Sequence, residues 1–231
     1  MKYDIERFES MPSTNDYAKE KRVEGKNLII VAKSQTGGRG TKGRNFSSAI
    51  GGLYVSVLSF YEDFLAKDAF RIMQNAAMAV CKTVEEYGVK PMIKWPNDIY
   101  VNGKKICGIL IENTFSGDKI RSSIVGIGVN VHNRLEGELT DIATSLLLET
   151  GKQIPVDEVE EKLLKYLNSA DTWREYPQYM AFIGETVTLL CGEEKIRAKV
   201  LGVDKEGNLL AETAGGEKKF SSAEVSLRGD A

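Results

Sequence analysis

Histidine and cysteine are scarce in this sequence, and their scarcity argues against several kinds of active site. Among 231 residues there are one histidine, His132, and three cysteines, Cys81, Cys107 and Cys191. The cysteines are widely spaced and form no CxxC pair, so they indicate neither a zinc site nor a disulfide framework and suit a reducing cytosol. A Ser-His-Asp or Cys-His mechanism would depend on His132 alone, and a lone histidine beside a strand end is usually a surface residue.

Long apolar runs and a strong charge excess are also missing. No apolar run approaches the roughly 18 residues that span a bilayer, and residues 1–6 alternate apolar and charged side chains, unlike a signal peptide. The 31 basic and 33 acidic side chains leave a formal net charge of −2. This balance argues against a broad nucleic-acid or membrane surface, which needs a net basic face. We expect a globular protein of the cytoplasm.

Apolar periodicity predicts a mixed β-sheet with flanking helices. A 3.6-residue period from residue 69 to 84 predicts a long helix that is capped by Asp68 and ended by Gly88. Ser13 or Thr14 is expected to cap a short first helix. Strands are predicted at 3–8, 27–32, 53–60, 92–95, 99–101, 106–112 and 124–131, with an Asn102-Gly103 hairpin turn between the fifth and sixth. Further helices are predicted at 143–149, 156–168 and 172–182.

From Gly184 onward the pattern changes to short strands separated by turn-rich spacers. They are predicted at 186–191, 196–203, 209–213 and 218–220. Roughly 45 residues of this kind are typical of a small SH3-like β-barrel. The sequence therefore predicts an α+β domain at residues 1–182, followed by a barrel at residues 183–231.

A glycine-rich basic loop, Gly37–Arg44, carries the first chemical signal. Four glycines in seven residues exclude regular structure, and the segment from Lys33 to Asn45 contains four cations and no anion. The backbone N–H groups of such a loop can form an anion-binding nest, to which the cations add charge. The loop matches neither the Walker A pattern nor a dinucleotide fingerprint that opens a helix. On its own it is equally well read as a solvated surface loop.

Two further segments favour an anion site. Lys94-Trp95-Pro96-Asn97-Asp98 places an aromatic ring and polar groups at a strand end. After the hairpin turn, Lys105 at the mouth of a buried strand can point a cation inward and neutralise charge at a reacting phosphate. Lys104 is expected to be an exposed hairpin lysine. Ser13, beyond capping a helix, can also bind a polar ligand group there.

Together these motifs identify a family resemblance that covers nearly the whole chain. Their order and spacing resemble those of biotin–protein ligases of the biotin–[acetyl-CoA-carboxylase] ligase type. The motifs are Ser13-Thr14-Asn15, Gln35-Thr36-x-Gly38-Arg39-Gly40, Lys94-Trp95-Pro96-Asn97-Asp98, Lys105-Ile106-x-Gly108-Ile109-Leu110-Ile111-Glu112, Gly126-x-Gly128-Val129-Asn130 and the terminal Glu224-Val225-Ser226-Leu227-Arg228.

The resemblance implies a class II synthetase-like fold and a two-step reaction. Biotin reacts with Mg-ATP to give biotinyl-5′-AMP, and a lysine of a biotin carboxyl carrier domain then takes the biotin. Lys105 and Arg39 are the implied catalytic residues, and Asp98 is a candidate base, metal contact or structural ion-pair partner. Biotin is implied to contact Ser13, Thr14, Asn15, Gln35, Gly38, Arg39, Gly40, Thr41, Lys105 and Gly108. The nucleotide is implied to contact Arg39, Lys42, Arg44, Phe46, Lys94, Trp95, Asn97 and Asn130. The metal ligands are left undetermined.

Two positions depart from the family pattern, and several alternatives stay open. Thr41 stands where many relatives have an arginine, and Phe46 where a tryptophan is common, so phosphate contacts and the cover of the pocket are expected to differ. A lipoate–protein ligase and a non-catalytic biotin-binding regulator are the rival functions. Ser13 lies too close to the start for an N-terminal winged helix, so no DNA binding is expected. Monomer and edge-to-edge homodimer both remain open.

Overall fold

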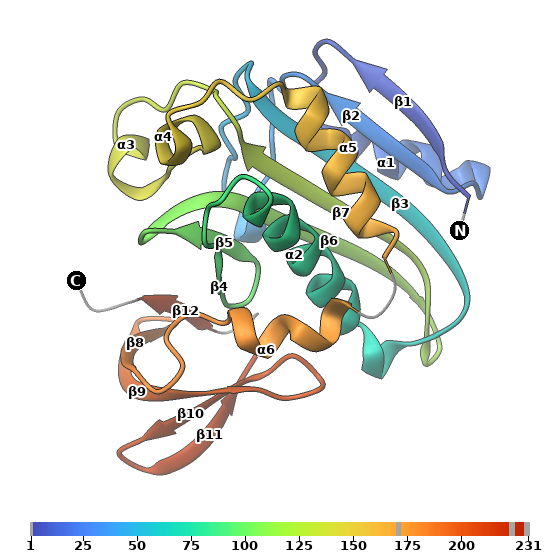
Figure 1. Ribbon diagram of the computed structural model, residues 1–231. Coiled ribbons are helices and arrows are strands. Elements are labelled where there is room, and N and C mark those ends of the chain that lie inside the picture. The colour runs from blue at the N-terminus through green and yellow to red at the C-terminus, as the bar shows by residue number, and fades with distance from the viewer. Residues whose placement is uncertain (1, 170–171, 222–224, 229–231) are drawn as a thin grey trace.

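The protein, described here from a computed structural model, folds around two β-sheets of very different size (Figure 1). The structure describes residues 2–169, 172–221 and 225–228. The larger sheet has seven strands in the order β1-β2-β3-β7-β6-β5-β4. They are β1 (Asp4–Phe8), β2 (Leu28–Ala32), β3 (Gly52–Leu65), β4 (Met92–Lys94), β5 (Asp98–Val101), β6 (Lys104–Ser116) and β7 (Lys119–Asn130). The β1–β2 pair is parallel and the other pairs are antiparallel, so the sheet is mixed as predicted.

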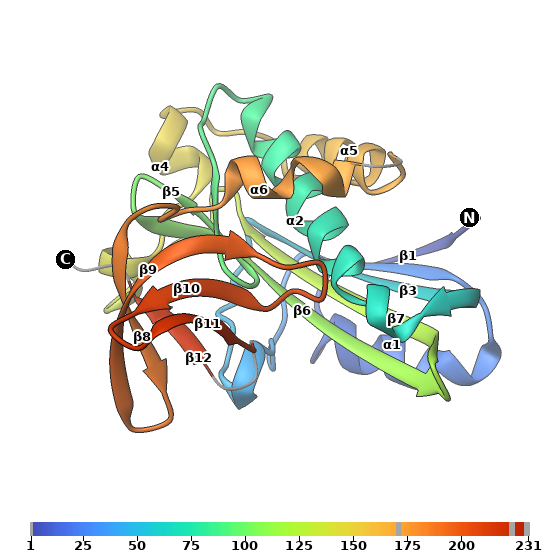
Figure 2. The ribbon, with the colours of Figure 1, turned by 90° about the horizontal axis from the view of Figure 1, so that it is seen from below.

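Helices lie on both faces of this sheet. Figures 1 and 2 show α2 and α5 against one face and α1 against the other. The α-helices are α1 (Thr14–Lys21), α2 (Phe70–Glu85), α3 (Leu139–Ile142), α4 (Leu146–Thr150), α5 (Val156–Leu167) and α6 (Tyr176–Tyr179). The 3₁₀ turns are η1 (Arg22–Glu24), η2 (Thr41–Gly43), η3 (Ala66–Asp68) and η4 (Thr172–Glu175). Across the described residues, no helix combines the length and apolar character that a membrane span needs.

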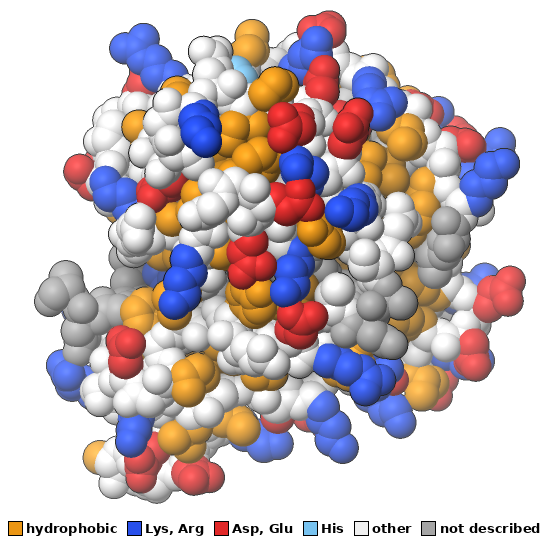
Figure 3. All heavy atoms as spheres, in the orientation of Figure 1, with side chains coloured by type: hydrophobic (Ala, Val, Ile, Leu, Met, Phe, Trp, Pro, Cys, Tyr) orange, Lys and Arg blue, Asp and Glu red, His pale blue; other side chains and the backbone are white. Residues whose placement is uncertain are grey.

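The main hydrophobic core lies between α2 and the sheet. Ile72, Ala76, Val80 and Val84 follow the predicted helical period and are all buried there. Burying one valine or isoleucine side chain contributes about 1.5–3 kcal/mol to the free energy of folding, so the packing of α2 stabilises the sheet. The opposite, solvent-facing side of the α2–α5 layer shows interspersed acidic and basic side chains rather than a patch of one sign (Figure 3).

The second sheet is antiparallel and follows the first in sequence. Its order is β11-β10-β9-β8-β12. The strands are β8 (Thr186–Cys191), β9 (Glu194–Val203), β10 (Leu209–Thr213), β11 (Gly216–Phe220) and β12 (Val225–Arg228). A mixed α+β domain followed by a small all-β unit agrees with the predicted fold. The boundary at residue 182 stays a prediction.

One specific contact between the two units involves a loop of the smaller one. The Trp95 indole N–H donates a hydrogen bond to the Gly207 carbonyl over 3.0 Å. Gly207 has φ of +91°, and a Cβ there would come within 2.4 Å of the Phe70 ring. Close approach therefore requires glycine at this position. The contact ties the loop between β9 and β10 to the segment that follows β4.

Three helix predictions are wrong in detail. Asp68 ends a 3₁₀ turn and pairs with Arg71 at 3.2 Å instead of capping α2, whose N-cap is Ala69. The helix predicted at 172–182 shortens to η4 and α6, because Met180 pairs with Ile93 in a parallel bridge. The helix predicted at 143–149 begins later, at Leu146. There the Ser145 hydroxyl accepts from the Leu148 backbone N–H at 3.3 Å.

Candidate active site

An open cleft lies beside the N-terminus of α1 and over strands β6 and β7. Its empty volume, including the open mouth, is about 460 Å³. Segments from five distant parts of the chain meet there, which local sequence patterns alone do not dictate. The lining residues are Ser13, Thr14, Asn15, Gln35, Arg39, Gly40, Thr41, Phe46, Asn97, Lys105, Gly108, Ile109, Leu110, Gly126, Ile127 and Gly128.

The floor of the cleft is a buried hydrogen-bond network at the start of α1. The Ser13 side chain caps the helix by accepting from the Asp16 backbone N–H at 3.2 Å, as predicted. Gln35 Oε1 accepts from the Thr14 backbone N–H at 2.8 Å and from the Thr14 hydroxyl at 3.0 Å. The Ser56 hydroxyl lies 2.7 Å from Thr14 Oγ1 and 2.6 Å from Asn15 Oδ1. These bonds fix the polar groups before any ligand arrives.

Glycines in the sheet make room for this network. A Cβ at Gly126 on β7 would lie 2.2 Å from Asn15 Oδ1. Two strand positions further on, a Cβ at Gly128 would lie 2.5 Å from the Phe46 ring. Because alternate strand residues share a face, the two glycines lie on the same side of β7, below Asn15 and Phe46. A side chain at either position would clash with one of these two groups.

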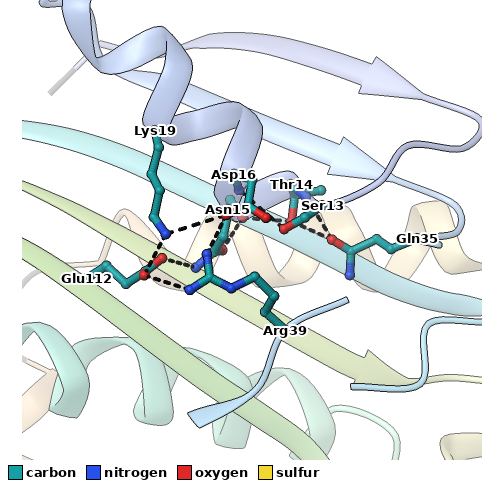
Figure 4. A network of polar contacts seen from close by, with 9 residues as sticks. Ser13, Thr14, Asn15, Asp16, Lys19, Gln35, Arg39 and Glu112 are labelled. Carbon is teal, nitrogen blue, oxygen red and sulfur yellow. Dashed lines mark hydrogen bonds and ion pairs between the residues drawn. The ribbon is translucent and has the colours of Figure 1, made fainter. Parts of the chain in front are cut away.

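The rim of the cleft is ionic (Figure 4). Arg39, from the glycine-rich loop, pairs with Asp16 and, at 3.2 Å, with Glu112 on β6. Lys19 reaches the same Glu112 carboxylate at 2.8 Å. Burial raises the pKa of Glu112, but hydrogen bonds from Lys19 and Asn15 and the charge of Arg39 outweigh it, so the net pKa is lowered. Glu112 is therefore ionised at neutral pH.

Lys105 stands on the far side of the cleft from this rim. Its ammonium lies 2.7 Å from Asp98 Oδ1 and 5.7 Å from the centre of the Phe46 ring. A Cβ at Gly108 would approach Lys105 Nζ to 2.9 Å, so glycine leaves the space that the ammonium uses. Asn97 is held beside it, because its amide donates to the Ile109 carbonyl at 2.9 Å. A cation at this place can neutralise a phosphate that enters the cleft.

The structure brings most of the predicted site residues together but leaves four elsewhere. Lys94 donates to the Tyr100 hydroxyl at 3.1 Å, and Trp95 is 3% exposed and faces the second sheet. The Asn130 amide donates to the Thr144 carbonyl at 3.0 Å in a buried position, and Arg44 folds back onto Thr41. These four do not line the cleft, and their contacts with the nucleotide stay predictions.

Three other predicted positions belong to the loop itself. Lys42 lies in η2, and its side chain falls outside the described part of the structure. A Cβ at Gly38 would lie 2.3 Å from Ser48 Oγ, so the loop packs closely at that point. Thr41, which stands where many relatives have an arginine, lines the cleft.

Sequence reasoning missed Ser56 and the partners of Glu112. Ser56 was read only as part of a strand alternation, although a fully buried hydroxyl in an apolar strand signals a specific partner. Asn15 and Glu112 are 97 residues apart in the chain, so only tertiary pairing joins them. Within the described residues, no three His, Cys, Asp or Glu side chains gather as a metal site.

Comparison with known proteins defines the class of this fold and site. The model of the Biotin/lipoate A/B protein ligase family matches residues 7–130, and that of the Biotin protein ligase C terminal domain matches residues 182–228. The chain belongs to the biotin/lipoate protein ligase family.

Individual relatives agree with this family. The bifunctional ligase/repressor BirA of Bacillus subtilis is 37% identical over 216 residues, covering 86% of this chain and 66% of its own length. The biotin–[acetyl-CoA-carboxylase] ligase of Paracoccus denitrificans is 28% identical over 87% of this chain and 90% of its own. The biotin protein ligase of Aquifex aeolicus, solved with biotin and ATP, has a TM-score of 0.77 and 33% identity over 98% of this chain and 99% of its own.

Proposed function

We propose that this protein activates biotin with Mg-ATP and transfers it to a lysine of a biotin carboxyl carrier domain. One observation carries the proposal: in a chain of this family, a preorganised polar floor, a basic glycine-rich loop and Lys105 meet in a single cleft. Two of the relatives reported above are named for biotin, and one of these two is solved with biotin and ATP. Acetyl-CoA carboxylase or a related carboxylase is the proposed source of the carrier domain.

The floor suits the polar ureido end of biotin. Thr14, Asn15 and Gln35 offer donors and acceptors whose directions are set by bonds to one another and to Ser56. Preorganised groups bind without a further cost of ordering, so specificity for this end of the ligand resides here. Leu110 and Ile127 supply apolar lining beside them.

In the first step a biotin carboxylate oxygen attacks the α-phosphorus of ATP. An O–P bond forms, the bond to pyrophosphate breaks, and biotinyl-5′-AMP results. Lys105 stabilises the negative charge that develops on the phosphate oxygens, and Arg39 with its loop holds the carboxylate and phosphates. Mg²⁺ enters with ATP as part of the substrate and is held largely by phosphates and water.

In the second step the carrier lysine amine attacks the biotinyl carbonyl. An amide bond forms, the bond from that carbonyl to the AMP oxygen breaks, and the amine loses a proton. Asp98 lies against Lys105, close to where this happens. Its carboxylate orients the Lys105 ammonium and is a candidate acceptor for the departing proton. We place both reactions in the cytoplasm, which suits the scattered cysteines.

The direct test combines the protein with biotin, Mg-ATP and a purified carrier domain. We expect pyrophosphate release in the first step, AMP release in the second, and a carrier mass gain equal to one biotin. Lipoate in place of biotin is the matched control and should give neither signal. Pyrophosphate release with lipoate alone would identify a lipoate–protein ligase. Biotin binding without either product would identify a non-catalytic regulator.

A further inference from the structure

Glu112 contacts two groups of the cleft without lining the cleft itself. It lies on β6 on the same face as Gly108 and Leu110, because alternate residues of a strand share a face, and it comes just after them. Its side chain is 23% exposed. One carboxylate oxygen, Oε2, accepts from the Asn15 amide at 3.1 Å. The other, Oε1, meets Arg39 at 3.2 Å and Lys19 at 2.8 Å.

The Asn15 contact fixes the direction of an amide in the floor. Asn15 Oδ1 points at the Ser56 hydroxyl and Nδ2 at Glu112, so the two ends of the amide have distinct partners. Glutamine at position 112 could rotate to present a donor instead of an acceptor. Its NH₂ group would then face the NH₂ group of Asn15, donor against donor, and Asn15 would no longer be held in one orientation.

The Arg39 contact fixes the loop. Arg39 has a second partner, Asp16, but that side chain is 47% exposed and its ion pair is screened by water. Glu112 is about half as exposed and is anchored on a sheet strand rather than at a helix end. Both acids hold the guanidinium, Asp16 from the helix end and Glu112 from the strand, and Glu112 is the one that also contacts the floor through Asn15.

We infer that Glu112 is a positioning residue for biotin activation, whose two carboxylate oxygens set the Asn15 amide in the floor and the Arg39 guanidinium in the loop. The inference rests on the proposed function. One carboxylate thus links the floor and the loop, although Glu112 itself neither lines the cleft nor contacts the reacting atoms.

The test compares binding of biotin alone with binding of a hydrolysis-resistant biotinyl-5′-AMP analogue, both measured by calorimetry. Glu112→Gln should raise the Kd for biotin about 10-fold through Asn15, as expected for one charge-assisted hydrogen bond. The Kd for the analogue should rise about 100-fold, because Arg39 is displaced as well. In an Arg39→Met background, the effect of Glu112→Gln on the analogue should shrink to its effect on biotin.

Controls separate a positioning role from general damage. Glu24→Gln removes an exposed carboxylate that pairs with Lys21 at 2.8 Å outside the cleft, and it should leave both Kd values unchanged. Glu112→Asp keeps the charge on a side chain one methylene shorter. It should weaken analogue binding at least 3-fold but less than Glu112→Gln does, and it serves as the test if the glutamine variant fails to fold.

The outcomes distinguish this inference from the proposed function. Wild-type protein that releases pyrophosphate from biotin and Mg-ATP, with unchanged Kd values in a folded Glu112→Gln or Glu112→Asp variant, would overturn the role of Glu112 alone. Equal weakening of biotin and analogue that persists in the Arg39→Met background would overturn the link to the loop. Wild-type protein that binds no biotin would overturn both.

Discussion

The floor of the cleft and its basic loop are held in place by different kinds of interaction. The floor residues Ser13, Thr14 and Asn15 are at most 5% exposed and are held by short hydrogen bonds from a helix and a strand. The loop contributes Arg39, which is 39% exposed and is held by ion pairs at the rim. Under the proposed function, fixed geometry recognises the uncharged polar end of biotin, whereas exposed charge on the loop recognises the polyanion.

The largest predicted effect tests the role of a cation in the cleft. Lys105→Ala should lower carrier biotinylation by about 100-fold or more, because it removes the cation that the proposed mechanism places at the reacting phosphate. Lys104→Ala is the matched control. Its ammonium donates to the Thr140 carbonyl at 2.7 Å, away from the cleft, and activity should stay within about 3-fold. Equal activity of the two variants in an initial-rate assay would remove Lys105 from the mechanism.

The next largest effect compares two glycines of β7, one below the floor and one below Phe46. Gly126→Ala pushes a methyl group into the Asn15 amide, and Gly128→Ala pushes one into the Phe46 ring. Overpacking of a fixed group costs about 1–3 kcal/mol, so Gly126→Ala should weaken biotin binding about 10-fold or more. Phe46 follows the glycine-rich loop and lies outside any helix or strand, so Gly128→Ala should have the smaller effect on biotin. The reverse order, measured by calorimetry, would contradict the comparison.

A smaller effect concerns one buried hydroxyl. Ser56→Ala leaves Thr14 and Asn15 without a shared partner, which costs about 1–2 kcal/mol and should weaken biotin binding roughly 10-fold. Ser122→Ala is the control, since this buried hydroxyl lies 2.6 Å from the Thr114 hydroxyl outside the cleft. Both variants should melt at lower temperature. Only Ser56→Ala should weaken biotin binding. Weaker binding in both variants would show a merely structural role for Ser56.

The smallest effect lies outside the cleft and depends on pH. Hydrogen bonds from Lys162 and Tyr166 on α5 lower the pKa of Glu86, just after α2, to about 2. Because the folded-state pKa is depressed, this stabilisation is present above the unfolded pKa of about 4.5 and is lost as pH falls toward 2. Glu86→Gln should cost about 0.5–1 kcal/mol at pH 7 and almost nothing near pH 2, by chemical denaturation, with biotin affinity unchanged. A constant difference at both pH values would refute the linkage.

The sequence predicts the strands of the sheet well because their signal is local. Alternating or continuous apolar runs locate β2, β3 and β7, and Asn102-Gly103 locates the β5–β6 turn, where both residues have positive φ. Helix ends are predicted less well. Asp68 has the right chemistry for a cap, but a 3₁₀ turn places it one residue too early.

Motifs predict which segments form the cleft, but not every side chain's direction. The family resemblance implies that Trp95 contacts the nucleotide, and this contact stays a prediction. In the structure Trp95 lies in the turn after β4, is buried, and donates to the Gly207 carbonyl on the side of the second sheet, a direction that strand alternation does not give. Ser56 and the contacts of Glu112 depend on tertiary pairing, which a single sequence does not specify.

One binding experiment tests the central claim most directly. Wild-type protein, Ser56→Ala and Arg39→Met are titrated with biotin and with a hydrolysis-resistant biotinyl-5′-AMP analogue. We predict that wild type binds both and the analogue more tightly, that Ser56→Ala weakens both by the same factor, and that Arg39→Met weakens the analogue about 10-fold more than biotin. Wild-type protein that binds neither ligand, or variants with indistinguishable profiles, would contradict a fixed floor for biotin and a charged loop for the phosphate.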